Sequence, residues 1–182
     1  MKFIQSVDDL MLMFIQNNMH NGFLDWIMPI FTSLGNLGLI WFVIAVILLF
    51  YKDYRKYGLM IIASLILCGL IGNVVLKNLV GRLRPCDVNT SIKLLIARPT
   101  DFSFPSGHTM SSFAPAVLLM FMNKKIGAVA LVLASIIAFS RLYLYVHYPS
   151  DVIAGALIGS ILALVLAEAF IHKEDMQNVY KQ

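Results

Sequence analysis

Three short stretches of the chain hold the residues that could do chemistry. The first contains Lys77 and Arg84, which are seven residues apart and lie just before Pro85. On an uninterrupted helix this spacing is two turns, so the sequence predicts that both cations project from one face before the proline ends the helix. Two stacked cations suit an anion with several oxygen atoms. The alternative is that two basic side chains extend toward the membrane interface.

The second stretch is Pro105-Ser106-Gly107-His108, at the start of an apolar run. A helix that begins here exposes free backbone N–H groups and the positive end of its dipole, and both favour phosphate. Ser106 and Gly107 allow an anion to approach closely, and His108 titrates near neutral pH. Taken alone, the stretch is also explained by a capped helix start with an incidental histidine.

The third stretch contains Arg141, His147 and Asp151. A carboxylate four residues after an imidazole can hydrogen-bond one ring nitrogen, which fixes the tautomer and leaves the other nitrogen as a nucleophile or base. The alternative is a helix-capping Asp151 beside an interfacial His147. Ionisable residues at membrane depth usually have a functional role, so we favour a functional site over a structural role for this stretch.

The composition places these stretches in a membrane. The chain has 182 residues, of which 59% are hydrophobic and only 13% are charged. A soluble domain has roughly a quarter of its residues charged, so the composition excludes a soluble globular domain, and it also excludes disorder. The net charge of +4 is modest, and we expect no nucleic-acid partner.

Five apolar stretches are interpreted as helices that cross the bilayer, which takes about 20 residues. They cover residues 26–51, 57–76, 107–122, 126 to beyond 140, and 152–171. The predicted fold is an all-α, polytopic transmembrane helix bundle that forms a single membrane-embedded domain over residues 1–182. Residues 3–15 carry apolar side chains at helical spacing, interrupted by polar ones. They predict an N-terminal amphipathic helix in the membrane interface, with a sixth, poor span as the alternative.

The basic residues predict which way the bundle faces. One side of the membrane collects Lys52, Arg55, Lys56, Lys124, Lys125, Lys173 and Lys181. This excess makes that side cytoplasmic. Basic residues on the opposite side are contrary to this positive-inside rule, so they are expected to have another role. They are Lys77, Arg82, Arg84, Lys93, Arg98 and Arg141. All three stretches are thus expected to meet on the extracytoplasmic face of the cell membrane.

The order and spacing of the three stretches resemble a known signature. Lys-x6-Arg-Pro, then Pro-Ser-Gly-His, then Ser-Arg-x5-His-x3-Asp resembles that of the type 2 phosphatidic acid phosphatase (PAP2) superfamily. The signature region is 77–151, and the resemblance covers roughly residues 24–171. It is to the small bacterial membrane branch, which includes lipid phosphatases and undecaprenyl-diphosphate phosphatases. Members commonly have six spans. One branch of undecaprenyl-diphosphate phosphatases has Asp in place of Gly107, so Gly107 indicates the broader lipid-phosphatase branch.

The resemblance implies a phosphatase that acts on a membrane lipid phosphate of the phosphatidate, phosphatidylglycerol phosphate or undecaprenyl diphosphate class. His147 would be the nucleophile that forms a phosphohistidine, Asp151 would orient it, and His108 would be the general acid. The phosphate-binding residues would be Lys77, Arg84, Ser106, Gly107 and Arg141. No cofactor and no metal ion are expected, because three cations would supply the electrostatic stabilisation.

Two other classes of protein remain as alternatives. A transporter would place its ionisable residues near the bilayer midplane rather than at one face. A catalytically silent lipid-phosphate-binding relative would be expected to lack the histidines or Asp151. Outside the signature, Asp87 and Asp101 are predicted to be solvated loop residues, and Arg82 is predicted to lie behind the site or at the lipid head group. The preferred lipid and the oligomeric state are left open.

Overall fold

The computed structural model describes residues 2–179, and all the regular structure in that range is helical. This confirms the predicted all-α class. The helices are α1 (Lys2–Asn18), α2 (Gly22–Leu34), α3 (Leu39–Leu49), α4 (Arg55–Cys68), α5 (Lys77–Val80), α6 (Pro85–Val88), α7 (Gly107–Met122), α8 (Lys124–Tyr143) and α9 (Pro149–Val179). A short turn, η1 (Asn36–Gly38), links α2 to α3, and a wider helical segment, η2 (Gly69–Leu76), continues α4 into α5.

Helix length confirms part of the predicted membrane topology. Three described helical stretches, which begin at Arg55, Lys124 and Pro149, are long and apolar enough to cross a bilayer. The pair α2 and α3 passes the same criteria as a fourth span, bent by 49°. The apolar helix α7 has 16 residues and is shorter than a full span. Five full spans are therefore not confirmed.

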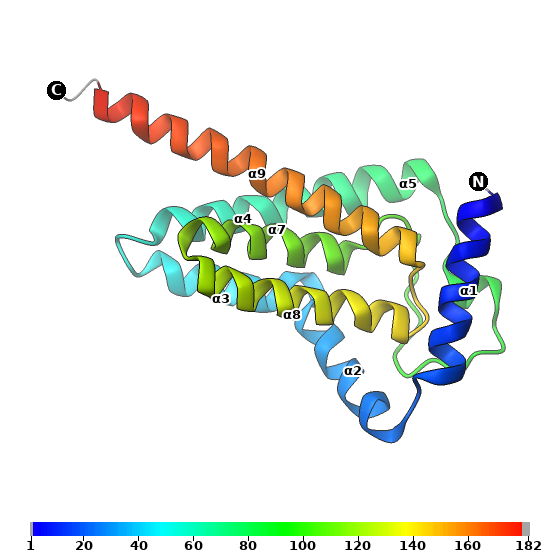
Figure 1. Ribbon diagram of the computed structural model, residues 1–182. Coiled ribbons are helices and arrows are strands. Elements are labelled where there is room, and N and C mark those ends of the chain that lie inside the picture. Colours follow the sequence, from blue (N-terminus) through cyan, green and yellow to red (C-terminus); the bar gives the residue numbers. More distant parts are fainter. Residues whose placement is uncertain (1, 180–182) are drawn as a thin grey trace.

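The N-terminal helix lies across one end of the bundle. Figure 1 shows α1 running crosswise to the long helices, and in the view from above it is seen almost end-on. Its exposed apolar side chains are Phe3, Ile4, Val7, Leu10, Met11, Met13 and Phe14. Leu12 and Ile15 are buried against the bundle. The predicted amphipathic helix is thus present, with an apolar outer face suited to the membrane interface.

A break between α2 and α3 interrupts the first apolar run. Leu37 and Gly38 both adopt left-handed backbone, with φ of 52° and 68°. The break packs against the start of α7, because a Cβ added to Gly35 would lie 2.8 Å from a ring carbon of His108. The bend therefore brings Asn36 toward His108, which the sequence did not indicate.

The prediction for Lys77 and Arg84 was wrong in its local geometry. The helix that carries Lys77 ends at Val80, because Gly81 adopts left-handed backbone with φ of 61° and ends the helix. Residues 81–84 are non-helical, and Pro85 opens α6 instead of ending a helix. The two cations therefore do not share a helical face, although both still reach the same site.

The central helix α7 is held closely by its neighbours. It packs against α4, α8 and α9. Gly155 and Gly159, four residues apart on α9, let the two backbones approach, since an added Cβ would lie 2.7 Å from Ser106 O and 2.5 Å from Met110 O. Small residues at this spacing are typical of close helix packing in membranes. This contact fixes the start of α9, and therefore Asp151, against the start of α7.

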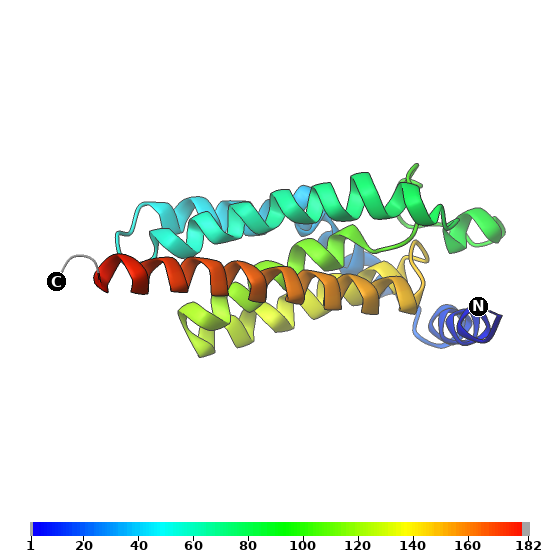
Figure 2. The ribbon, with the colours of Figure 1, turned by 90° about the horizontal axis from the view of Figure 1, so that it is seen from above.

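The loops divide between the two ends of the bundle. Figures 1 and 2 place the α3–α4 loop, the α7–α8 turn and the end of α9 at one end, and residues 81–106 and 144–148 at the other. Lys52, Lys124 and Lys125 are exposed at the first end, whereas the three signature stretches lie at the second. Lys181 lies outside the described residues.

Candidate active site

The signature residues converge although they are up to 74 positions apart in sequence. Six of the eight predicted site residues line one cavity of about 740 Å³: Lys77, Arg84, Gly107, His108, Arg141 and His147. Ser106 and Asp151 are fully buried and do not line it. The remaining walls come from α2, η1, α4, η2 and the loop 96–101. Among the side chains that the structure describes, residues 3–170, no three His, Cys, Asp or Glu residues are placed to hold a metal ion.

Lys77 and Arg84 meet on one carboxylate. Asp101 pairs with the Lys77 ammonium through Oδ2 and accepts a hydrogen bond from Arg84 Nη2 at 2.7 Å through Oδ1. The prediction that Asp101 is a solvated loop residue was wrong, although its side chain stays half exposed. Burial raises the pKa of Asp101, but the hydrogen bond from Lys77 and the charge of Arg84 outweigh this effect and hold the pKa below its usual range. An ionised carboxylate therefore occupies two of the cations that would bind a phosphoryl group.

Arg141 is the third cation of the cavity. It lies in the last turn of α8, is only 4% exposed, and donates from Nη1 to the Thr32 hydroxyl of α2. Its Nε is buried and has no hydrogen-bond partner among the described residues. A buried, incompletely paired guanidinium on a cavity wall is suited to an anionic ligand.

The tautomer of His147 follows from its neighbour. Arg84 Nη1 lies 3.0 Å from His147 Nε2. A guanidinium can only donate, so Nε2 must carry the lone pair and the proton must be on Nδ1. Arg84 Nη1 also donates to the Val146 carbonyl at 2.7 Å, which fixes it beside the ring. The basic nitrogen of His147 therefore lies next to the cations.

Asp151 lies on the other side of the His147 ring. Its Oδ2 is 3.6 Å from His147 Nδ1 and accepts hydrogen bonds from Ser103 Oγ at 2.5 Å and from the Tyr148 N–H at 2.9 Å. Ser103 Oγ is itself 3.5 Å from Nδ1. Asp151 thus lies on the Nδ1 side of His147, but at 3.6 Å the predicted direct hydrogen bond is not formed, and Ser103 lies beside both groups.

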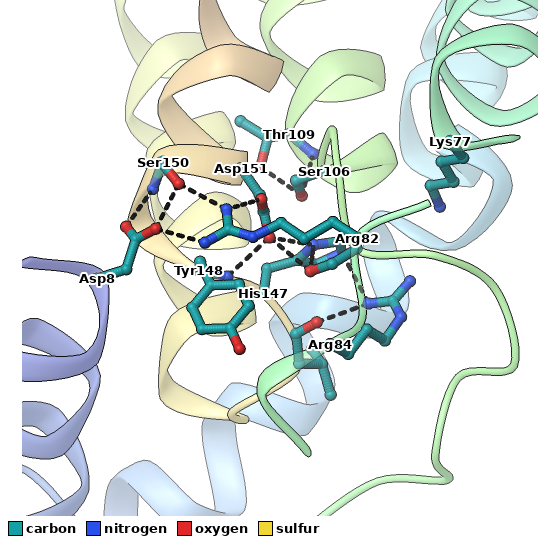
Figure 3. Close-up of polar contacts among 12 residues, drawn as sticks. Asp8, Lys77, Arg82, Arg84, Ser106, Thr109, His147, Tyr148, Ser150 and Asp151 are labelled. Carbon is teal, nitrogen blue, oxygen red and sulfur yellow. Dashed lines mark hydrogen bonds and ion pairs between the residues drawn. The ribbon is translucent and has the colours of Figure 1, made fainter. Parts of the chain in front are cut away.

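The start of α7 brings His108 to the cavity. Its Nε2 lies 2.9 Å from Asn36 Oδ1, across the break between α2 and α3. Ser106 caps the helix by accepting from the Thr109 backbone N–H at 3.5 Å, and its hydroxyl also accepts from the Thr109 hydroxyl at 2.9 Å (Figure 3). Ser106 does not line the cavity. A Cβ added to Gly107 would lie 2.8 Å from Asn73 Oδ1. The structure thus places Gly107 and His108 at the cavity but not the side chain of Ser106.

Three further residues of the site were not predicted: Ser103, Asn36 and Asn73. Ser103 lies three residues before Ser106, between Phe102 and Phe104, and no pattern in the sequence marked it. Asn36 was hidden in an uncharged run that was interpreted as a plain span. Asn73 lies four residues before Lys77, so helical spacing could have placed both on one face.

The environment of His147 predicts the acid limb of the pH profile. Burial, followed by the charges of Arg84 and Arg141, holds the pKa of His147 well below its usual range. A nucleophile must be deprotonated, so kcat/KM is expected to stay high until the pH falls below about 6.5, the ordinary histidine value. Measuring the pH profile of kcat/KM on two substrates whose phosphates differ in pKa would separate ionisation of the enzyme from ionisation of the substrate. An enzyme limb above pH 7 would contradict the prediction.

Removing the charge of Asp101 is expected to strengthen phosphate binding. Asp101→Asn frees Lys77 and Arg84, so KM and the inhibition constant of inorganic phosphate should both fall by about tenfold, because one charge-assisted hydrogen bond is worth about 1.5 kcal/mol. Asp53→Asn is the matched control, since Asp53 is an exposed carboxylate in the α3–α4 loop and does not line the cavity. Weaker phosphate inhibition in Asp101→Asn would mean that Asp101 holds the cations in place instead.

Comparison with known proteins identifies the family of the chain. Residues 53–174 match the PAP2 superfamily. The chain is 35% identical over 122 residues to an undecaprenyl-diphosphatase of Sulfolobus acidocaldarius, covering 66% of this chain and 59% of that protein. It thus spans less than two thirds of that relative. It is 30% identical over 170 residues to a lipid A 4'-phosphatase of Bacteroides thetaiotaomicron, covering 87% of this chain and 74% of the relative.

Solved structures show the same bundle. The transmembrane PAP2 type phosphatidylglycerolphosphate phosphatase from Bacillus subtilis has a TM-score of 0.79 at 27% identity, over 95% of this chain and 88% of the other. LpxE of Aquifex aeolicus has a TM-score of 0.72 at 29% identity, over 87% and 93% of the two chains. With a family match over more than half of its length and the fold of these phosphatases, the chain belongs to the PAP2 superfamily.

Proposed function

We propose that this protein is an integral-membrane lipid phosphatase that hydrolyses phosphomonoester or pyrophosphate head groups through a phosphohistidine on His147. One observation carries the proposal: the unprotonated Nε2 of His147 lies beside Arg84 in a cavity that Lys77 and Arg141 also line. The relatives named undecaprenyl-diphosphatase and lipid A phosphatase support the reaction class.

In the first step, Lys77, Arg84 and Arg141 bind the phosphoryl oxygens after the phosphate displaces Asp101 from Lys77 and Arg84. His147 Nε2 attacks phosphorus, the P–O bond to the lipid breaks, and His108 donates a proton to the departing oxygen. Positioning and charge stabilisation are the dominant contributions to phosphoryl transfer, and three cations supply both. This arrangement supports a reaction that proceeds without a metal ion.

In the second step, water attacks the phosphohistidine. The P–N bond breaks, its electron pair returns to Nε2, and inorganic phosphate leaves. His108, which has given up its proton, is placed to accept one from the water. Asp151 stabilises the positive charge that His147 carries between the two steps, because its Oδ2 lies on the Nδ1 side of the ring.

The shape of the cavity supports an amphiphilic substrate. Beside its polar end, the cavity is lined by Leu37 of η1 and Leu65 of α4, and Leu37 is fully exposed on the outside of the bundle. Lipid tails can therefore extend between these elements while the phosphate meets the cations. Each buried CH₂ of a tail contributes about 0.8 kcal/mol, which a soluble phosphate ester lacks.

Phosphate release from a panel of lipids tests the proposal. Phosphatidate, phosphatidylglycerol phosphate and undecaprenyl diphosphate would be assayed with the purified protein in detergent and EDTA. We expect turnover of at least one lipid in EDTA. Loss of activity that Mg²⁺ restores would contradict metal independence, and binding without turnover of any lipid would support the silent lipid-binding alternative.

The site is proposed to face outside the cytoplasm, and cysteine labelling in intact cells tests this. Thr90→Cys lies in the exposed loop at the site end, and Asp53→Cys lies in the exposed loop at the basic end. An impermeant maleimide is expected to label Thr90→Cys and not Asp53→Cys. The parent chain is the control, because Cys68 and Cys86 are both buried. The reverse pattern would place the site in the cytoplasm.

A further inference from the structure

Arg82 links the predicted interfacial helix to the carboxylate behind His147. Its Nη1 donates to Asp151 Oδ1 at 2.6 Å, and its Nη2 donates to Asp8 Oδ2 at 2.7 Å (Figure 3). The guanidinium is stacked on the ring of Tyr148, 3.9 Å from its centroid. Arg82 does not line the cavity, so it acts on the site from behind.

Asp8 is built into this contact. It is only 2% exposed, although it lies on a helix at the edge of the molecule. Besides Arg82, it accepts hydrogen bonds from the Ser150 N–H at 2.9 Å and the Ser150 hydroxyl at 2.5 Å, one residue before Asp151. A buried carboxylate is costly unless it is paired and hydrogen-bonded, and Asp8 is both. The polar residue that interrupts the apolar pattern of α1 is therefore part of its docking face.

The charges of Asp8, Arg82 and Asp151 affect how well the cluster stabilises a positively charged His147. Arg82 alone would offset the charge of Asp151, which must stabilise a positively charged His147. Asp8 restores one negative charge, so the Asp8–Arg82–Asp151 cluster carries a formal charge of −1. Asp8 and Asp151 are buried and Arg82 is one-fifth exposed, so water screens these interactions only weakly.

We infer that Asp8, acting through Arg82, is a positioning residue for Asp151 and His147, which makes α1 part of the catalytic machinery and not only a membrane contact. This inference rests on the proposed function, because it assumes that His147 accepts the phosphoryl group. Asp8 touches no phosphate-binding residue, so its loss should slow the chemical step and leave substrate binding unchanged.

The test compares two neighbouring carboxylates of α1. Asp8→Asn keeps the shape but removes the charge. We expect kcat to fall by about 10- to 100-fold with KM unchanged, by analogy with the carboxylates that orient metal-binding histidines. Asp9→Asn is the matched control, because Asp9 is exposed, accepts a hydrogen bond from Gln5 at 2.9 Å and is not one of the carboxylates that Arg82 bridges. Its kcat should stay within about twofold of the parent value.

The pH profile separates this role from a merely structural one. Without the Asp8 charge, the imidazolium of His147 is less stable, so the acid limb of kcat/KM should move to lower pH in Asp8→Asn and stay in place in Asp9→Asn. Asp8→Glu, which returns the charge, should restore the limb. If Asp8→Asn does not fold, Arg82→Lys replaces it: a lysine keeps the charge but cannot bridge both carboxylates, so kcat should fall while the limb stays.

The outcomes distinguish this inference from the proposed function. If His147→Ala is inactive but Asp8→Asn turns over like Asp9→Asn with the same pH profile, the inference is wrong and the proposed function stands. In Asp8→Asn, a rise in KM alone, or a fall in kcat with an unmoved acid limb, would equally overturn it, as would parent-like kcat in Arg82→Lys. If His147→Ala keeps normal turnover, the proposed function itself is wrong.

Discussion

His147→Ala is expected to abolish phosphate release from every lipid that the protein accepts. Water would have to attack phosphorus without the covalent intermediate, and loss of an enzyme nucleophile costs at least about 10⁴-fold in kcat. The cations of the cavity remain, so the variant should still bind inorganic phosphate. Steady-state phosphate release, with phosphate binding measured on the same preparation, checks both statements.

His20→Ala is the matched control for that experiment. His20 lies between α1 and α2, pairs with Asp25 at 2.8 Å and is stacked on Tyr143, away from the cavity. Its removal should leave kcat close to the parent value. Normal turnover in His147→Ala would contradict the assignment of the nucleophile.

His108→Ala is expected to lower kcat in a way that depends on the leaving group. A general acid contributes about 10²–10⁴-fold, so turnover of an alkyl lipid phosphate should fall by that amount. A nitrophenyl phosphate ester leaves as a stable anion that needs no proton, so its turnover should fall much less. The measurement is the ratio of the two losses in one preparation, with labelling of His147 as a check on the first step.

Equal losses on both substrates would contradict the acid role of His108. They would indicate that His108 only shapes the cavity, as its contact with Asn36 would also allow. Asn36→Ala provides the comparison, since it removes the contact and keeps the imidazole. A general acid predicts that Asn36→Ala is milder than His108→Ala on the alkyl substrate.

Local patterns in the sequence predicted the parts of the site that depend on short spacing. His147 and Asp151 lie four residues apart around one helix start, and the structure places the Asp151 carboxylate 3.6 Å from His147 Nδ1. The apolar runs likewise predicted an all-helical bundle with the three stretches at one end. These features follow from helix geometry and from the cost of placing charge in hydrocarbon.

The remaining features depend on contacts between segments that sequence spacing does not encode. Lys77 and Arg84 do not share the predicted helical face, because the helix ends at Gly81. Glycine commonly ends helices, so this residue could have indicated the break. Asp101 meets both cations only because of the path of the loop that carries it. Asp8 was interpreted only as an interruption of an apolar helix, because its partner Arg82 lies 74 residues away in the sequence.

The phosphohistidine that we propose on His147 can be trapped before water hydrolyses it. A lipid substrate labelled with ³²P at the scissile phosphate would be mixed with the protein and quenched within milliseconds in alkali, in which phosphohistidine survives. Protein-bound label is expected on His147 alone, with none in His147→Ala. Label on His108 or on any other residue of the parent protein would contradict it.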